Sequence, residues 1–469
     1  MPADTKYLSY PTEYNLVTLN LITPVNGIIN LKPLMQELNL YEDIYSSTIS
    51  GEVVLSESLG IVSKFFLNGT EFIQIQLQKT TQDKSVLSRN YRVYKMGKRV
   101  TGDSNNYEVY VLHFISEEFL LSEQNRLSKG YAGKQIDFIV NDILSNYIKT
   151  KKTLFIDATL GAYDFVLPNK KLFETINWLS TYAQPSGKKG ADILFFENSN
   201  GYCFRSLQTL FLQTEYQTYK FDPKNISETS MNQKITNALN FEVLDYFDTL
   251  NATTNGIFAN KIITFDPLLR KVNKTDGMFD YSKYAGSKLN GNPLTNISNG
   301  YKNRLGQALY SATRTQVAGL EVGALRLASG NSEQKKNTYI SQLPDAAPND
   351  IYIERYIPNR VAQLGLANYM RIKLSVPGDH NLCAGMAVAF NTYGIDPVAF
   401  SEAGSNSLRT PDPFYSGKYL ISAVRHSVSA KTGAYISIIE LIKDSVSSNY
   451  PGFNSSDSVL KQLSDGVQI

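Results

Sequence analysis

The chain has 469 residues, of which 42% are hydrophobic and 19% charged, so it can form several folded units and is not disordered overall. Its 46 basic and 43 acidic side chains nearly balance, and a formal net charge of +3 argues against a protein that works through direct phosphate contacts. No run of about 18 uninterrupted apolar residues occurs, so no membrane span is predicted.

Residues 1–122 form the first predicted unit, and their pattern is typical of strands. The clearest stretch is residues 72–78, where Ile73, Ile75 and Leu77 share one face and glutamines occupy the other. Further strands are predicted at residues 52–55, 91–95 and 107–116, with a polar turn at 101–106. Regular strands joined by short polar turns predict an antiparallel barrel or sandwich.

The period changes in residues 123–235, which we predict to form a small α+β unit. After Gly133, apolar residues recur at the spacing of an amphipathic helix. A second helix is predicted with Asn169 as its N-cap and an apolar stripe over residues 172–183. Residues 192–205 are typical of a hairpin.

A second β-rich region is predicted from residues 236–280 and 348–445. Between these segments, residues 281–347 are rich in Gly, Ser, Asn, Lys and Arg, and we interpret them as a peripheral insertion with one helix around residues 302–316. Residues 446–469 are predicted to be a flexible tail. The predicted strands are 240–246, 260–265, 369–376, 386–390, 419–426 and 435–441, the last two joined by a turn at 430–433. The expected fold class is α+β, mainly β.

Histidine and cysteine, which often catalyse reactions or bind metals, are few in this chain. His113, His380 and His426 have no Cys, Glu or second His at ligand spacing. Cys203 and Cys383 lie in apolar or strand-like runs, which favours small core residues over a disulfide or a metal site. We therefore predict no catalytic residue, no metal site and no cofactor.

Several other features have a structural interpretation that is simpler than a functional one. Residues 130–134 lack the glycine spacing of a phosphate loop and read as a turn before a helix. The adjacent carboxylates of residues 42–43 and 117–118 should diverge on a regular element, which argues against a shared acid–base site. Trp178 is the chain's one tryptophan and suits core or rim packing. The basic stretch at residues 149–152, with three lysines, is typical of a solvated helix end.

The order of these blocks resembles the central baseplate hub protein of contractile-tailed, T-even-like bacteriophages. The resemblance extends over most of residues 43–445 and rests on the sequence order of the blocks, because no single motif is specific. The insertion at 281–347 is larger than the family core requires. The stretches that carry the resemblance are residues 49–77, 107–122, 133–146, 172–183, 370–390 and 419–441.

This resemblance implies a subunit with two tube-type antiparallel β-barrel domains and an inserted α+β domain. It implies a homotrimer whose six barrels form a ring with pseudo-sixfold symmetry, adapting the sixfold tail tube to the threefold central spike. The implied partners are the tail spike protein, tail tube or tube-initiator proteins, the tape-measure protein and other baseplate proteins. DNA would contact the ring only while it passes through the central channel. The implied location is the virion tail baseplate, after synthesis in the host cytoplasm, and no enzyme activity is implied.

Two alternatives remain open at this point. A hub of a type VI secretion spike or of a contractile injection particle would use the same barrels. A β-rich carbohydrate-active enzyme or binding protein would need converging carboxylates in a cleft lined by aromatic residues.

Overall fold

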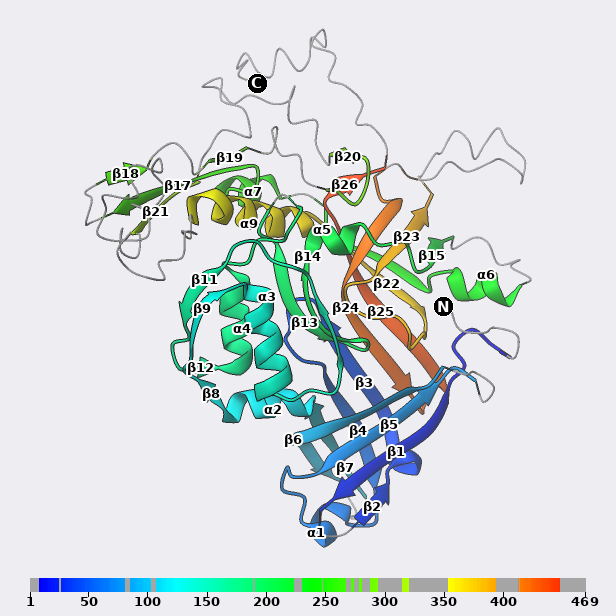
Figure 1. The fold of residues 1–469 in the computed structure, drawn as a ribbon. Coiled ribbons are helices and arrows are strands. Elements are labelled where there is room, and N and C mark those ends of the chain that lie inside the picture. The colour runs from blue at the N-terminus through cyan, green and yellow to red at the C-terminus, as the bar shows by residue number, and fades with distance from the viewer. Residues whose placement is uncertain are drawn as a thin grey trace, which may run out of the picture.

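The computed structural model describes residues 8–24, 27–80, 85–102, 107–188, 190–222, 230–246, 248–266, 271–273, 278–280, 287–293, 314–319, 353–393, 412 and 414–447. A large, mostly antiparallel sheet of 13 strands dominates it, with most of the helices beside and above the sheet and α1 at its lower end (Figure 1). The mainly β, α+β class predicted from the sequence is confirmed.

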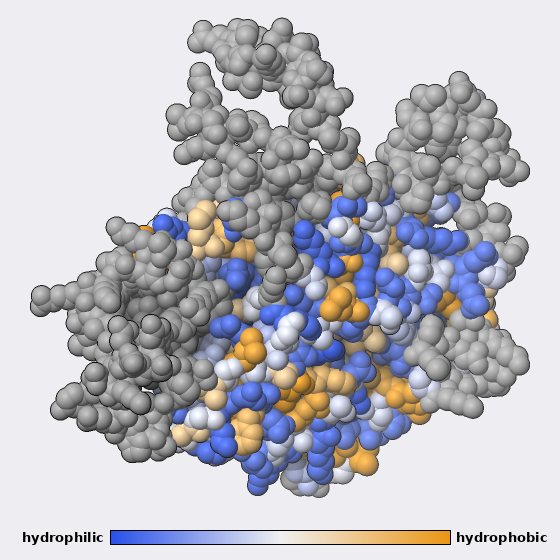
Figure 2. Space-filling model, turned by 45° about the horizontal axis from the view of Figure 1, so that its top comes forward, coloured by the Kyte–Doolittle hydropathy of each residue, from blue (hydrophilic) through white to orange (hydrophobic). Residues whose placement is uncertain are grey.

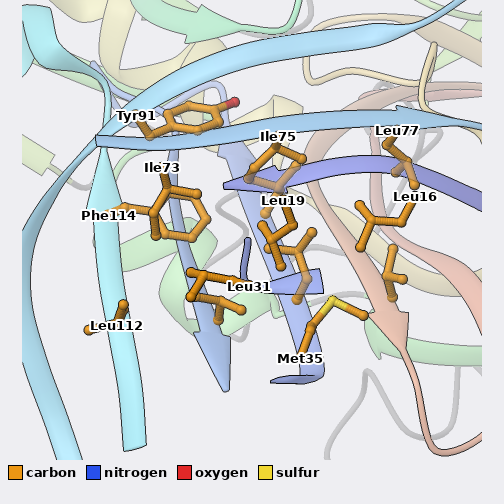
Figure 3. Packing of buried hydrophobic residues seen from close by; sticks show 14 of the residues in the cluster. Leu16, Leu19, Leu31, Met35, Ile73, Ile75, Leu77, Tyr91, Leu112 and Phe114 are labelled. Atoms are coloured by element: carbon orange, nitrogen blue, oxygen red, sulfur yellow. The ribbon is translucent and has the colours of Figure 1, made fainter. Parts of the chain in front are cut away.

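The first half of the sheet comes from the N-terminal strands. Alternate residues of these strands point into one core, as the sequence pattern predicts, and Ile73, Ile75 and Leu77 are fully buried there. Figure 3 shows these side chains packing against Leu19, Leu31 and other apolar residues of the same core. The elements are β1 (Asn15–Thr23), β2 (Gly27–Asn30), η1 (Lys32–Leu34), β3 (Met35–Asp43), β4 (Ser50–Glu57), α1 (Ile61–Phe65), β5 (Phe72–Gln78), β6 (Leu87–Thr101) and β7 (Glu108–Ile115).

The second half of the sheet is built from C-terminal strands around its own core. Residues 370–377 alternate between buried and half-buried positions, as predicted, and the predicted turn at 430–433 joins the two longest strands of this half. The elements are β15 (Thr218–Phe221), β16 (Asn240–Asp245), β22 (Met370–Pro377), β23 (Ala387–Thr392), β24 (Gly417–Ser429) and β25 (Ala434–Lys443).

The two halves are one sheet, because β3 pairs with β24 from Glu37 opposite Ser429 to Asp43 opposite Ala423. The strand order is β16-β22-β25-β24-β3-β4-β7-β6-β5-β1-β2, with β23 and β15 branching from β24. Val428, from the second half, is buried in the core of the first. No strand pairing among the described residues closes either half on itself, so the two predicted barrels correspond to two halves of one open sheet. Alternation identifies a strand and its buried face but not the strand beside it.

An α+β unit packs beside the sheet, around a core of its own. Both predicted helices and the predicted hairpin are present, and Trp178 packs edge-on against Phe165 and Tyr182. The helical elements are α2 (Glu117–Gln124), α3 (Ile136–Asp142), its π-helical continuation η2 (Ile143–Tyr147), α4 (Leu172–Ser180) and α5 (Leu207–Phe211). The strands are β8 (Arg126–Leu127), β9 (Gly130–Lys134), β10 (Thr153–Ile156), β11 (Tyr163–Val166), β12 (Lys170–Lys171), β13 (Ile193–Asn198) and β14 (Gly201–Ser206).

Two local predictions in this unit are wrong. Residues 130–134 form strand β9, which pairs with β11, rather than a turn. The N-cap of α4 is Lys171 and not Asn169, which has a left-handed backbone with φ of 49°. Residues 130–134 are held by their pairing with β11, and in the second case β12, which begins directly after Asn169, pairs with β8 and shifts the start of the helix to Leu172.

A smaller set of elements packs around Phe258 and Phe279. Its longest helix is missing from the sequence prediction, because Pro358 lies inside it and interrupts the expected pattern. The elements described outside the main sheet and the α+β unit are α6 (Met231–Thr236), α7 (Thr249–Thr254), β17 (Ala259–Asp266), β18 (Lys271–Asn273), β19 (Met278–Asp280), β20 (Asn292–Pro293), β21 (Arg314–Gly319), α9 (Ile353–Ala367) and β26 (Ser445–Val446).

The predicted insertion and tail fall largely outside the described residues. Of residues 281–347, only 287–293 and 314–319 are described, and of residues 446–469 only the first two. The predicted helix at 302–316 lies outside the described residues except at its end, where residues 314–316 belong to strand β21. Within the described ranges, no helix is long and apolar enough to cross a membrane. On the face shown in Figure 2, apolar residues are interspersed among hydrophilic ones.

Candidate functional site

The tip of the β13–β14 hairpin, residues 197–201, contacts both halves of the sheet, and we call this set of contacts the hairpin joint. The turn is held by Asn198, whose Oδ1 accepts hydrogen bonds from the backbone N–H groups of Asn200 (3.0 Å) and Gly201 (3.2 Å). Gly201 has a φ of 146°, and β10 passes directly against it in parallel pairing with β14. The sequence therefore needs glycine at this position.

Glu197 connects the hairpin to the first half of the sheet. Its side chain is only 1% exposed, and its two carboxylate oxygens accept hydrogen bonds from Ile49 N (3.0 Å) and Ser116 Oγ (2.8 Å). The ammonium of Lys152 lies 2.6 Å from the same carboxylate and 2.7 Å from that of Glu118. Burial raises the pKa of Glu197, and Lys152 opposes that rise. Lys152 thus stabilises the charged form of Glu197, which burial alone would disfavour.

Ser199, at the tip of the turn, contacts two strands of the sheet. Its hydroxyl donates a hydrogen bond to Glu42 on β3, and its carbonyl accepts one from the guanidinium of Arg89 on β6. Glu42 also accepts a hydrogen bond from the backbone N–H of Ala384, at 3.1 Å. The Glu42 carboxyl group therefore lies between the hairpin tip and a loop of the second half.

The same loop of the second half contacts the hairpin directly. Asn198 Nδ2 donates to the carbonyl of Ala384 at 2.8 Å, and Asn200 Nδ2 donates to the Cys383 sulfur at 3.2 Å. A Cβ atom on Gly385 would lie 2.8 Å from the Phe196 ring, so the loop and the strand are in close contact. The hairpin joint therefore connects the α+β unit to both halves of the sheet at once.

Glu42 is fully buried at the hairpin joint, and burial raises its pKa from 4.5 to about 7. Its hydrogen bonds from Ser199 and Ala384 oppose this shift, and the nearby carboxylate of Glu197 adds to it. The carboxyl group therefore changes its charge near neutral pH, at the place where three parts of the molecule meet.

We expect this group to make the protein less stable as the pH rises from 5 to 8. The pKa of Glu42 is higher in the folded chain than in the unfolded chain, so folding binds a proton in this interval. The contribution of Glu42 to the free energy of unfolding is present at pH 5 and falls by about 2 to 3 kcal/mol between pH 5 and pH 8. Urea denaturation at both pH values tests this, with Glu42→Gln as the comparison, because the variant should lose that part of the pH dependence.

Titrating groups that do not interact with Glu42, such as the buried His426, are common to both proteins and cancel in the comparison. If wild type and Glu42→Gln show the same change in unfolding free energy between pH 5 and pH 8, Glu42 does not titrate near neutral pH.

The two cysteines form no disulfide, and each histidine of the sequence analysis has its own hydrogen-bond or ion-pair partner. Cys203 and Cys383 are free and buried, as predicted. His113 lies on β7 with Nδ1 3.6 Å from Glu52, and His380 Nε2 lies 3.0 Å from Ser85 Oγ. Among the residues that the structure describes, no three His, Cys, Asp or Glu side chains gather as metal ligands would.

His426 is fully buried on β24 and belongs to a small polar network in the core. Nε2 donates to the carbonyl of Leu382 at 3.0 Å, so Nδ1 accepts, and the Tyr435 hydroxyl lies 2.9 Å from it. Burial lowers the pKa of His426 to about 4. A neutral histidine with both nitrogens bonded has a structural role here.

The adjacent carboxylates diverge, as predicted. Glu42 points to the hairpin joint, whereas Asp43 Oδ1 accepts from the backbone N–H of Tyr45. Glu118 binds Lys152, whereas the side chain of Glu117 lies 3.8 Å from Arg92.

The interpretation of residues 149–152 as a solvated helix end is wrong for Lys152. Its ammonium lies between the carboxylates of Glu118 and Glu197, and its side chain is 26% exposed. Sequence analysis also missed the role of Glu197. The available signal was a carboxylate directly after the apolar run of residues 193–196, because a charge there must be solvated or paired.

No protein-family model and no curated protein match this sequence. Solved structures with a similar fold include the tail protein from Neisseria meningitidis MC58, at 8% identity and a TM-score of 0.50, covering 92% of this chain and 97% of that one. They also include the 43 kDa tail protein of prophage MuSo2 from Shewanella oneidensis, at 8% identity and a TM-score of 0.50, covering 92% and 99% of the two chains. At this identity the likeness concerns the fold.

Proposed function

We propose that this chain is a structural hub subunit of a phage tail baseplate. The observation that carries the proposal is the likeness in fold to two tail proteins, which extends over 92% of this chain in each case. The block order in the sequence, which resembles a baseplate hub, supports it independently of that comparison. The role is mechanical, and the described residues contribute contacts and shape to it.

The proposed assembly is a homotrimeric ring. Each chain supplies two β halves, so three chains supply six, and a ring with threefold symmetry can then present a pseudo-sixfold face to a tube. Such an adaptor must hold its two halves in a constant relation. The β3–β24 ladder and the hairpin joint do this within one chain.

The proposed neighbours are the threefold spike on one side and the sixfold tube or its initiator on the other. The tape-measure protein and then DNA would pass through the ring, and other baseplate proteins would surround it. A passage for DNA should bind phosphate weakly, and the formal net charge of +3 is compatible with that.

We expect the purified protein to form trimers of three 52.5 kDa chains, measured by light scattering coupled to size exclusion. Electron micrographs should then show rings with a central channel and threefold symmetry. A stable monomer at high concentration, even after mixing with its spike protein, would contradict the hub role.

A further inference from the structure

A polar cleft of about 520 Å³ opens beside the hairpin joint. One wall is formed by β5 and β6, through Gln74 and Asn90. The other is formed by Lys151, which precedes β10, by Thr153 at its start, and by the hairpin turn. Its volume lies in the range of ligand sites, but every residue that lines it is polar or charged except Gly201, whereas small-molecule pockets are lined mostly by apolar residues. The cleft therefore suits a polar chain segment better than a compact apolar ligand.

The charges of the cleft favour an anionic ligand. Three cationic side chains line it, Arg89, Lys151 and Lys152, against the single carboxylate of Glu118. Lys152 is already paired with Glu118 and Glu197. Lys151 is exposed and has no ion-pair partner among the described residues. The cationic groups of Arg89 and Lys151 therefore remain to bind a ligand.

Arg89 can accept a ligand without leaving its place. Its Nη1 donates to the carbonyl of Ser88 at 2.9 Å and its Nη2 donates to that of Ser199, which fixes the guanidinium at the mouth of the hairpin joint. A guanidinium has five N–H groups, so others remain for a carboxylate. Arg89 thus belongs both to the hairpin joint and to the cleft.

We propose that this cleft binds an acidic, extended peptide segment of a partner protein. Carboxylates of the segment would bind Lys151 and Arg89, and its backbone would bind the amides of Gln74 and Asn90. Nucleic acid fits less well, because a strand needs a row of phosphate contacts and Glu118 occupies one wall. The inference rests on the proposed function, in that the partner would be a neighbouring tail protein. A carboxylate in the cleft would also compete for Lys152 and so act on the hairpin joint.

The test uses hexaglutamate as the probe and the full-length chain in its native state of assembly, with binding measured by calorimetry at 50 mM and 200 mM salt. We expect hexaglutamate to bind, more weakly at the higher salt, and hexaglutamine not to bind. Lys151→Gln should weaken binding by about five- to tenfold. Lys149→Gln, an exposed lysine two positions away that does not line the cleft, should leave binding unchanged.

Several results would overturn the proposal. These are no hexaglutamate binding at 50 mM salt, an equal loss of binding in the Lys149→Gln variant, and tighter binding of a short single-stranded DNA than of hexaglutamate. The oligomeric state, measured separately, distinguishes the two proposals. A trimer without peptide binding rejects only the cleft, and a monomer that binds the peptide rejects only the hub.

Discussion

Replacing Lys152 by methionine should lower the free energy of unfolding by about 3 kcal/mol at pH 8, because it leaves the buried carboxylate of Glu197 without its cation. The loss should be smaller at pH 5. Without Lys152 the pKa of Glu197 rises further in the folded chain, so protonation stabilises the variant at low pH and this gain disappears as the pH rises. Urea denaturation followed by the fluorescence of Trp178, which lies in the same α+β unit, measures the effect.

A second substitution separates the charge from the packing. The double variant Lys152→Met with Glu197→Gln should recover much of the lost stability, because the glutamine keeps a hydrogen-bonding oxygen and carries no charge. Lys170→Met is the matched control. Its pair with Glu174 has the same 2.6 Å separation, but the two side chains are 34% and 51% exposed, so the cost should stay within about 0.5 kcal/mol. Equal losses in Lys152→Met and Lys170→Met would show that burial of Glu197 is unimportant.

Gly201→Ala should cost about 3 kcal/mol or more. An added Cβ would lie 2.1 Å from the carbonyl oxygen of Thr153, and both the hairpin strand and β10 are fixed by their pairing. The φ of 146° is also a conformation that alanine rarely adopts. The two effects add, because relieving the contact requires moving the backbone of β10. Thermal and urea denaturation, monitored by circular dichroism, measure the loss.

Gly433→Ala provides the comparison for that prediction. Gly433 also has a positive φ, of 63°, but nothing lies within 4 Å of the added Cβ, so only the backbone preference changes. We expect a cost of about 1 kcal/mol. If the two variants lose the same amount, the close approach of β10 to the hairpin turn is not needed for stability.

Both predictions concern the hairpin joint, and both bear on the proposed hub. A ring that transmits force between a spike and a tube requires its parts to move together. The joint provides this through buried polar contacts whose partners lie far apart in the sequence, such as Glu42 with Ser199 and with Ala384. Weakening the hairpin joint should lower the stability of the subunit and leave the surfaces that contact other proteins unchanged.

Local patterns in the sequence determined much of the secondary structure. Period-two alternation identified strands such as β5 and β22, and the 3.6-residue period identified α3 and α4, because those periods depend only on which neighbouring residues face the core. Where the local sequence pattern favoured one secondary structure and the tertiary contacts another, the chain adopted the one that the tertiary contacts favour. Residues 130–134 became a strand and residues 353–367 a helix despite Pro358.

The partners of these elements were decided only by the tertiary structure. The pairing of β3 with β24, which makes one sheet of two β regions, joins residues nearly 400 positions apart that share no local pattern. The hairpin joint likewise needs the carboxylates of Glu42 and Glu197 to be buried, with the partly exposed Lys152 beside Glu197. Their charges are visible in the sequence, but the burial that makes them matter arises only when three distant segments pack against each other.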